Sequence, residues 1–423
     1  MDCVRSKQNT QWGPQALQGP ENRLFTALEN GDLHLLRILG ARHADSVLQV
    51  RGGELRYRPQ AAAQFGLSGL WSLEYTQELT SPLCITCARG YTECVRYLLH
   101  RRADPNASPG GSSPLHKACA GGHGDCVQLL LEHGANPNIM SDAGETPLHY
   151  CDINKSLRCA QLLLDYGAEL NQATESTQDT PLHMAARLNL LAHAQLYLHH
   201  GASVHFQNQE GETPLTTACG AKVDDEDSSL ALCHLLLERG ADLEIPDQQD
   251  RRPLHHACRA AKHRVVELLL CAGADVNATD YNGVSPLSWA LQAAELKLEN
   301  RPHLIVHILL NHGAHIFCPD MFGKVLRCCS RIPQIIGLLY NSYRDLQTCE
   351  QWKCEIPEEV IQAHHSFYTT FFNLSGSVRS LQHLCRFTLR RHLGCRCHSL
   401  IPLLPVPRSL QEYLLLDSKL SLS

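Results

Sequence analysis

The sequence contains no apolar run long enough to cross a membrane, which would take about 20 consecutive and predominantly apolar residues. Its first 20 residues also lack the basic and then apolar pattern of a secretory leader. An excess of positive charge is missing too, because the net charge is −6 and the isoelectric point lies near 6.5. Such a balance gives no electrostatic footprint for nucleic acid. We therefore expect no membrane span and no nucleic-acid partner.

Motifs that carry catalytic chemistry are absent as well. The sequence has no glycine-rich phosphate loop, no isolated cysteine–histidine pair and no paired ligand sets at zinc spacing. The run 395–398 (CRCH) is dense in ligand types, but no second ligand pair follows it, so zinc is disfavoured there. The sequence thus predicts a protein that is not an enzyme, with no catalytic residue, no cofactor and no metal. Twenty cysteines without a leader indicate a reducing compartment, and we expect the cytosol or the nucleus.

What the sequence does contain is a repeat. The same frame returns seven times, opened by a proline that usually stands in a Thr/Ser-Pro-Leu-His context, at Pro82, Pro114, Pro147, Pro181, Pro214, Pro253 and Pro286. The successive spacings are 32, 33, 34, 33, 39 and 33 residues. A period near 33 with this opening is typical of ankyrin repeats. The pattern predicts an all-α ankyrin solenoid of helix pairs joined by short hairpin loops.

The chemistry of one copy explains its residues. Pro147 suits the first turn of a helix, where its missing N–H is not needed, and Thr146 can cap that turn. The second helix of a copy is expected to end at a glycine that adopts the left-handed conformation, at Gly134, Gly167, Gly201, Gly240, Gly273 and Gly313. The first copy has Arg102 at this place. Each helix pair leaves apolar surface that a neighbouring pair must cover, so the copies are expected to be stable as a stack.

Two residue types recur at fixed places in the repeat. The histidines of the Pro-Leu-His turns are His116, His149, His183 and His255, and the cysteines fall five or twelve residues after the repeat proline. Because these residues follow the period, we interpret the histidines as links between neighbouring turns and the cysteines as small buried apolar groups. A catalytic or metal-binding role is the less favoured alternative.

The chain is expected to have six parts. They are a disordered leader at 1–22, a degenerate capping repeat with an insert at 23–79, seven repeats at 80–318, a degenerate capping repeat at 319–345, a helical linker at 346–376 and a small C-terminal module at 377–416. In the insert, Phe65, Trp71 and Tyr75 are expected to pack against the repeats. Residues 357–374 predict one helix in the linker.

Two copies carry extra residues between their helices. The fifth copy has them near residues 221–229, where four consecutive acidic residues lie, and the seventh has them near 293–301. Insertions on one edge of a repeat protein belong either to a binding face or to a tolerated loop, and the sequence leaves both interpretations open.

The C-terminal module resembles a SOCS box. The order Ser380-Leu381, Cys385 and Leu389 matches an Elongin-binding box, and Leu404-Pro405-Val406-Pro407 matches a cullin-5 box. Both boxes follow the repeats in the expected order, so the chain resembles the ankyrin repeat and SOCS box family. Forty residues with two small helices bury their own apolar surface poorly, which also favours a partner.

The resemblance implies a function and a set of partners. It implies a substrate-recognition subunit of a ubiquitin ligase built from Elongin B, Elongin C, cullin-5 and a RING-box protein, with an unidentified protein as substrate. The alternative is an ankyrin scaffold that binds Elongin B/C without promoting degradation. The implied Elongin C contacts are Ser380, Leu381, Leu384, Cys385 and Leu389, and the implied cullin-5 contacts are Leu404, Pro405, Val406, Pro407, Leu410 and Tyr413.

One asparagine suggests a modification. Asn277 follows an acidic–apolar pair, Asp275-Val276, and has Leu269 eight residues before it. This pattern resembles the ankyrin asparagines hydroxylated by the 2-oxoglutarate-dependent enzyme that inhibits hypoxia-inducible factor. Asn277 is equally interpreted as an ordinary hairpin residue.

Overall fold

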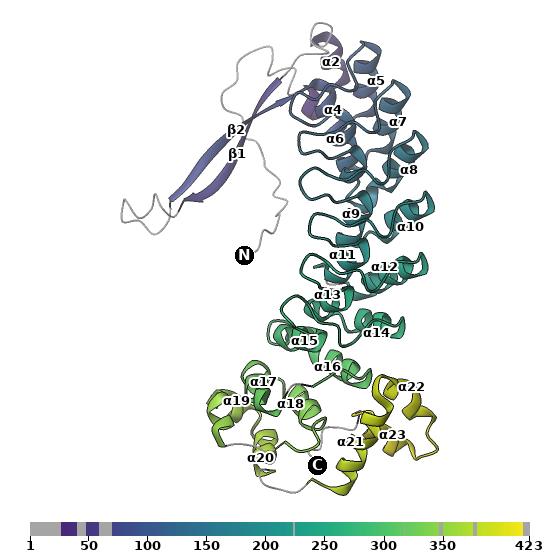
Figure 1. Cartoon of the computed structure of the whole chain (residues 1–423). Coiled ribbons are helices and arrows are strands. Elements are labelled where there is room, and N and C mark those ends of the chain that lie inside the picture. Colours follow the sequence, from purple (N-terminus) through teal and green to yellow (C-terminus); the bar gives the residue numbers. More distant parts are fainter. Residues whose placement is uncertain are drawn as a thin grey trace. The chain divides into compact units, whose positions relative to one another are not determined.

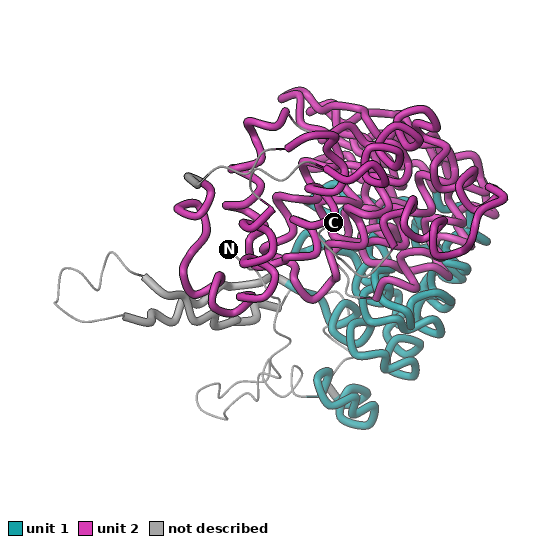
Figure 2. Tube along the Cα trace, turned by 90° about the horizontal axis from the view of Figure 1, so that it is seen from below, with its two compact units in different colours: residues 1–169 teal, residues 170–423 magenta. Residues whose placement is uncertain are grey.

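The computed structural model describes residues 27–39, 48–58, 70–222, 225–316, 318–346, 350–374 and 379–417. The chain divides into two compact units, residues 1–169 and 170–423 (Figure 2). Within the described residues, no helix combines the length and the apolar character needed to span a membrane.

The first unit contains helix pairs of the repeat. Its helices are α2 (Leu33–Leu39), α4 (Pro82–Arg89), α5 (Thr92–His100), α6 (Pro114–Gly121), α7 (Gly124–Glu132), η2 (Pro147–Tyr150), η3 (Asn154–Ser156) and α8 (Leu157–Asp165). The first helices of successive copies pack on one another, α4 on α6 and α6 on η2, and the second helices do the same, α5 on α7 and α7 on α8 (Figure 1). The third copy departs from the expected pattern, because its first helix is a short 3₁₀ turn.

The insert before the first regular copy is a β-ribbon. Strands β1 (Leu48–Arg58) and β2 (Leu70–Thr80) pair in antiparallel register, with Leu48 opposite Thr80 and Arg58 opposite Leu70 (Figure 1). The sequence analysis did not anticipate these strands. The expected packing of Phe65, Trp71 and Tyr75 lies outside the described residues and side chains.

The second unit continues the helix pairs. They are α9 (Pro181–Arg187), α10 (Leu191–His199), α11 (Pro214–Gly220), α12 (Glu226–Glu238), α13 (Pro253–Ala260), α14 (His263–Cys271), α15 (Pro286–Ala294) and α16 (Pro302–Asn311), with the 3₁₀ turn η4 (Leu298–Asn300) before α16. The odd-numbered helices α9 to α15 pack in one layer and the even-numbered helices α10 to α16 in a second (Figure 1).

The repeat prolines and glycines behave as the sequence predicts. Each of the seven prolines begins its helix, and Thr146 caps the turn that Pro147 opens. All six closing glycines have positive φ angles, between 85° at Gly240 and 102° at Gly273. Arg102 adopts the same conformation without being a glycine, with φ of 64°. The backbone of the first copy therefore keeps the repeat geometry despite the arginine.

The acidic insertion of the fifth copy extends a helix. Helix α12 is 13 residues long, and Asp225 caps it. Glu226 in its first turn accepts a hydrogen bond from the backbone amide of Arg264, and Asp227 pairs with the Arg264 side chain. Acidic groups suit a helix N-terminus. These two carboxylates therefore connect neighbouring helix pairs within the second unit.

Helices η5 (Pro319–Met321), α17 (Phe322–Cys329), α18 (Pro333–Tyr340), η6 (Glu350–Glu355), α19 (Glu358–Ala363) and α20 (His365–Asn373) follow the repeats. The single helix expected at 357–374 is wrong, because the chain breaks at His364, where φ is −119° and ψ is 36°. After this break, α20 buries Tyr368 and Phe371, and the Phe371 ring meets the Tyr340 ring edge-on at 5.2 Å.

The C-terminal module has three helices, α21 (Leu381–Leu393), α22 (Cys397–Leu400) and α23 (Arg408–Leu414), with the 3₁₀ turns η7 (Gly394–Arg396) and η8 (Ile401–Leu403) between them. Its core is small, built from buried Cys397, Ile401 and Leu414. Apart from the β-ribbon, the described residues form helices and turns, so the predicted all-α fold class is confirmed.

Candidate protein-binding site

Helix α21 exposes three of its apolar side chains. Leu381 is 78% exposed and Leu389 is 40% exposed, while Cys385 between them is exposed as well. Residues four apart lie on the same face of a helix, so these three side chains form one stripe, which we call the α21 stripe. Leu384 beside it is half-buried. Ser380 caps the helix, with its hydroxyl accepting a hydrogen bond from the amide of His383 at 3.2 Å.

The opposite face of α21 is polar and buried. His383 is fully buried, and its Nε2 lies 2.8 Å from the carbonyl oxygen of Tyr343. Arg386 is 3% exposed and donates to the carbonyl oxygen of Asn341. Burial lowers the pKa of Arg386 to about 10 and also lowers the pKa of His383. On these two faces the usual arrangement of an amphipathic helix is reversed, since His383 and Arg386 face the protein while the α21 stripe faces solvent.

Arg390 joins the module to the last regular helix pair. Its guanidinium donates to Asn311 Oδ1 at 2.7 Å and to the carbonyl oxygens of Leu310 at 2.9 Å and Leu414 at 2.8 Å. The side chain of Asn311 in turn donates to the carbonyl oxygen of Leu415 at 2.9 Å. These bonds connect α16, α21 and α23, so they fix the orientation of the α21 stripe relative to α16.

The residues of the predicted cullin-5 box divide into two groups. Leu404 and Leu410 are partly buried and pack against the core of the module, whereas Pro405 and Pro407 are exposed. Val406 is half-buried, and its amide donates to the carbonyl oxygen of Leu404 at 2.8 Å.

Tyr413 has a role inside the module. Its ring lies under the guanidinium of Arg386, 4.2 Å from ring centroid to Cζ. Its hydroxyl is buried without a hydrogen-bond partner among the described residues. Of the residues predicted for the cullin-5 contact, Pro405 and Pro407 are thus the ones that the structure leaves fully open to a partner.

Asn277 ties two hairpins together. Its Nδ2 donates to the carbonyl oxygen of Gly313 at 3.1 Å, and its Oδ1 accepts from the amide of His315 at 2.7 Å. In the first unit, Asn106 and Asn138 each make the same pair of bonds to the backbone of the following hairpin. The hydrogen bonds at this position therefore belong to the repeat, and the predicted hydroxylation of Asn277 stays a prediction.

The periodic histidines and cysteines have the surroundings expected of structural residues. The Nε2 atoms of His116, His183 and His255 contact backbone carbonyls of the following hairpin at 3.0 to 3.1 Å. Cysteines five residues after the proline, such as Cys119 and Cys258, are fully buried, and burial raises the pKa of both thiols. Buried thiols of high pKa are poor nucleophiles.

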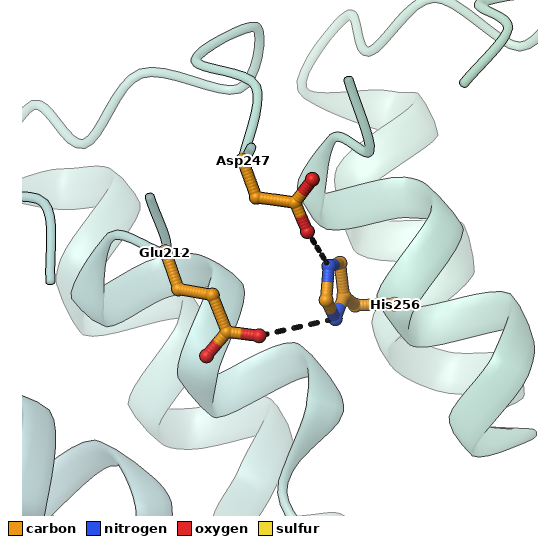
Figure 3. A group of neighbouring side chains, drawn as sticks. All are labelled: Glu212, Asp247 and His256. Carbon is orange, nitrogen blue, oxygen red and sulfur yellow. Dashed lines mark hydrogen bonds and ion pairs between the residues drawn. The ribbon is translucent and has the colours of Figure 1, made fainter. Parts of the chain in front are cut away.

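A second polar cluster escaped the sequence analysis. Glu212, Asp247 and His256 come from three separate parts of the second unit and each offers a possible ligand atom, all within 4.8 Å of one another (Figure 3). The Nε2 of His256 lies 2.9 Å from Asp247 Oδ2, and its Nδ1 lies 3.7 Å from Glu212 Oε1. Arg251 contacts the same Asp247 oxygen at 2.8 Å.

The geometry of this cluster suits a hydrogen-bonded ion cluster better than a metal ion. Each ring nitrogen of His256 faces a different carboxylate, whereas one ion would need both carboxylates around a single nitrogen (Figure 3). Burial opposes ionisation of Asp247, but the hydrogen bonds from His256 and from the amides of Arg251 and Gln249 outweigh it and hold the pKa of this carboxyl at about 2. We therefore assign no metal to the cluster, which joins two hairpins to α13.

Comparisons with known proteins identify both the repeats and the C-terminal module. The model for ankyrin repeats (3 copies) matches residues 61–141, 83–174, 137–205, 182–280 and 225–320, and the SOCS box model matches 377–415. These matches define a class of proteins with ankyrin repeats followed by a SOCS box.

Individual relatives narrow the class. Human ankyrin repeat and SOCS box protein 18 is 48% identical over 422 residues, which cover 99% of this chain and 90% of that protein. Mouse ankyrin repeat and SOCS box protein 16 is 37% identical, covering 93% of this chain and 85% of that protein. The crystal structure of the human ASB11 ankyrin repeat domain shares 27% identity and covers 55% of this chain and 97% of its own, with a TM-score of 0.47. The chain belongs to the ankyrin repeat and SOCS box family. Membership implies the general role of a substrate adaptor in an Elongin B/C–cullin ubiquitin ligase.

Proposed function

We propose that this chain is the substrate-recognition subunit of an Elongin B/C–cullin-5–RING ubiquitin ligase. The ankyrin repeats bind the target protein, and the SOCS box connects it to Elongin C and cullin-5, so that the target is ubiquitinated and degraded. The observation that carries the proposal is the α21 stripe, in which Leu381, Cys385 and Leu389 face solvent while the polar face of the same helix is buried.

Energetics favour a partner on this stripe. Burying a leucine side chain is worth about 1.5–3 kcal/mol relative to leaving it exposed, so an open stripe forgoes that free energy in the isolated chain. An apolar anchor truncated at an interface centre costs about 2–4 kcal/mol of binding. Because α21 is already capped and fixed by Arg390, little ordering is required when the partner binds.

The second contact of the proposal uses the exposed prolines. Pro405 and Pro407 restrict the backbone of the turn before α23, and stiff segments lose less entropy on binding. We assign the cullin-5 contact to this turn, with Leu404 and Leu410 supporting it from the core. Ubiquitin transfer itself is assigned to the partner subunits.

The test is co-expression of the full chain with Elongin B/C, comparing wild type with Leu381→Ala/Cys385→Ala. We expect the double variant to lose Elongin B/C co-purification while its circular dichroism and melting stay those of wild type, because both side chains are exposed. The matched control is Leu188→Ala/Cys271→Ala, which removes an exposed leucine and an exposed cysteine from the repeats and should keep Elongin B/C. Undiminished co-purification of the first variant would refute the assignment.

A further inference from the structure

One hairpin of the second unit is held rigidly around a tryptophan. Asp280 is 6% exposed, and its Oδ1 accepts the amides of Asn282 and Val284, which fixes the hairpin turn. Its Oδ2 accepts a hydrogen bond from the indole nitrogen of Trp289 at 3.0 Å. The hairpin and the first turn of α15 are therefore clamped together, and Trp289 is left half-buried beside them.

The tip of this hairpin presents a tyrosine to solvent. Tyr281 is 80% exposed, although its backbone amide donates to the carbonyl oxygen of Gln249 in the preceding hairpin at 2.9 Å. The backbone is thus anchored while the ring is free. A large ring on a fixed backbone makes contact area at a low cost in conformational entropy.

An arginine accompanies the tryptophan. The Arg259 guanidinium, from the adjacent helix α13, lies over the Trp289 ring with Cζ 5.9 Å from the ring centroid. Two other arginines of the second unit pair with the protein's own carboxylates: Arg187 with Asp179 and Arg251 with Asp247. Among the described residues, Arg259 is exposed and forms no such ion pair.

The insertion in the seventh copy adds an exposed leucine on the side of Trp289. Hydrogen bonds from the amides of Leu296 and Lys297 to the carbonyl oxygen of Ala293 continue the helical path beyond α15. Leu296 is seven residues after Trp289, on the same side of that path and about 10 Å along it. Leu296 is 86% exposed, and Leu298 in the following turn is 46% exposed. We call Tyr281, Trp289, Arg259 and Leu296 the inner strip.

We propose that the inner strip is a recognition site for the substrate, and that it binds an acidic peptide segment whose carboxylate is flanked by apolar side chains. This inference deepens the proposed function, on which it rests. Tyrosine, tryptophan and arginine are the residue types that dominate binding energy at interfaces. The guanidinium over the indole keeps its N–H edge available for a carboxylate, which forms paired, charge-assisted hydrogen bonds with arginine. Tyr281 and Leu296 then contact the apolar side chains on either side.

The experiment screens the purified full chain against a displayed library of random dodecapeptides. The affinity of a selected peptide is then measured by fluorescence polarisation. We expect selected sequences to combine Asp or Glu with Leu or aromatic residues. Tyr281→Ser and Arg259→Glu should each weaken the selected peptide at least tenfold. A peptide with Lys in place of its acidic residue should bind Arg259→Glu more tightly than it binds wild type.

Two controls and one local probe sharpen the result. Tyr166→Ser and Arg239→Glu change an exposed tyrosine and an exposed arginine elsewhere and should leave the affinity unchanged. Fluorine NMR of 5-fluorotryptophan-labelled protein, with the Trp289 signal assigned from Trp289→Phe, should show that signal shift when the peptide binds. Selection of basic or purely apolar peptides, or an affinity that the two strip variants do not alter, would overturn the inference. A wild-type chain that dimerises while the strip variants stay monomeric would also overturn it, because a second copy would then be the occupant.

The peptide experiment can fail independently of the proposed function. The strip variants should still co-purify with Elongin B/C, because the strip lies in the repeats and the α21 stripe lies in the SOCS box. Peptide binding in a chain that fails to recruit Elongin B/C would sink the ligase proposal alone. Normal recruitment with no acidic peptide selected would sink the inner strip alone.

Discussion

The buried histidine of the second repeat should make the first unit sensitive to acid. His116 is fully buried, with its Nδ1 accepting the amide of Ser113 at 3.1 Å and its Nε2 lying 3.0 Å from the carbonyl oxygen of Glu145. A carbonyl only accepts, so the Glu145 contact places a proton on Nε2, and the Ser113 amide donates to an unprotonated Nδ1. A second proton, on Nδ1, would displace that amide hydrogen bond and leave the Ser113 hydroxyl, 2.8 Å away, as its acceptor. Burial lowers the pKa of His116 to about 4, against an ordinary value of 6.5.

The size of the effect follows from linkage. Between pH 6.5 and pH 4 the unfolded chain binds the proton and the folded chain does not, so stability falls as the pH is lowered through that window. Each pH unit within it costs about 1.4 kcal/mol for this group, which gives about 2 kcal/mol at pH 5 and about 3 kcal/mol in full. Above the window the group adds no pH dependence.

The assay is denaturant unfolding at pH 7.5 and pH 5.0, followed by circular dichroism. We expect the wild type to lose about 2 kcal/mol more between the two pH values than His116→Gln, which cannot titrate. The variant should also be less stable at pH 7.5, because the Glu145 contact changes. His100→Gln, an exposed control in the same unit, should behave like wild type. Equal pH dependence in wild type and His116→Gln would refute the reasoning.

Three further predictions concern the second unit. Pro405→Ala/Pro407→Ala should lose cullin-5 yet keep Elongin B/C, since both prolines are exposed; simultaneous loss of both partners in pull-downs would contradict the two-contact reading. Co-expression with the asparagine hydroxylase should add one oxygen to the peptide that contains Asn277, and mass spectrometry finding it unmodified beside an oxidised control substrate would exclude the site. Arg390→Lys cannot reach three acceptors in fork geometry, so amide exchange around α23 should speed up while the melting of the repeats is unchanged.

Local signals were the most predictable part of the fold. Proline, threonine and glycine act on their own turn, so the helix starts and the left-handed exits could be placed from the period alone. The break at His364 was missed because it is caused by tertiary packing, in which Tyr368 and Phe371 turn into the aromatic cluster around Tyr340. The β-ribbon was missed because its two strands lack a short turn motif between them.

The sequence identified the residues of the α21 stripe but could not show which face of the helix is buried. The motif residues Leu381, Cys385 and Leu389 were identified from spacing, yet the burial of Arg386 opposite them depends on Asn341, which is 45 residues away in the chain. The cluster around His256 was missed for a related reason. His256 is adjacent to the expected structural His255, and its partners Glu212 and Asp247 come from other parts of the unit.

The exposure of the α21 stripe has a consequence for the abundance of the protein in a cell. A chain synthesised in excess of its partners displays Leu381 and Leu389 to the quality-control machinery, which recognises exposed apolar surface on orphan subunits. We expect its steady-state abundance to follow the supply of Elongin B/C and not its own synthesis rate. Gene dosage of this chain would then be buffered by the amount of its assembly partner.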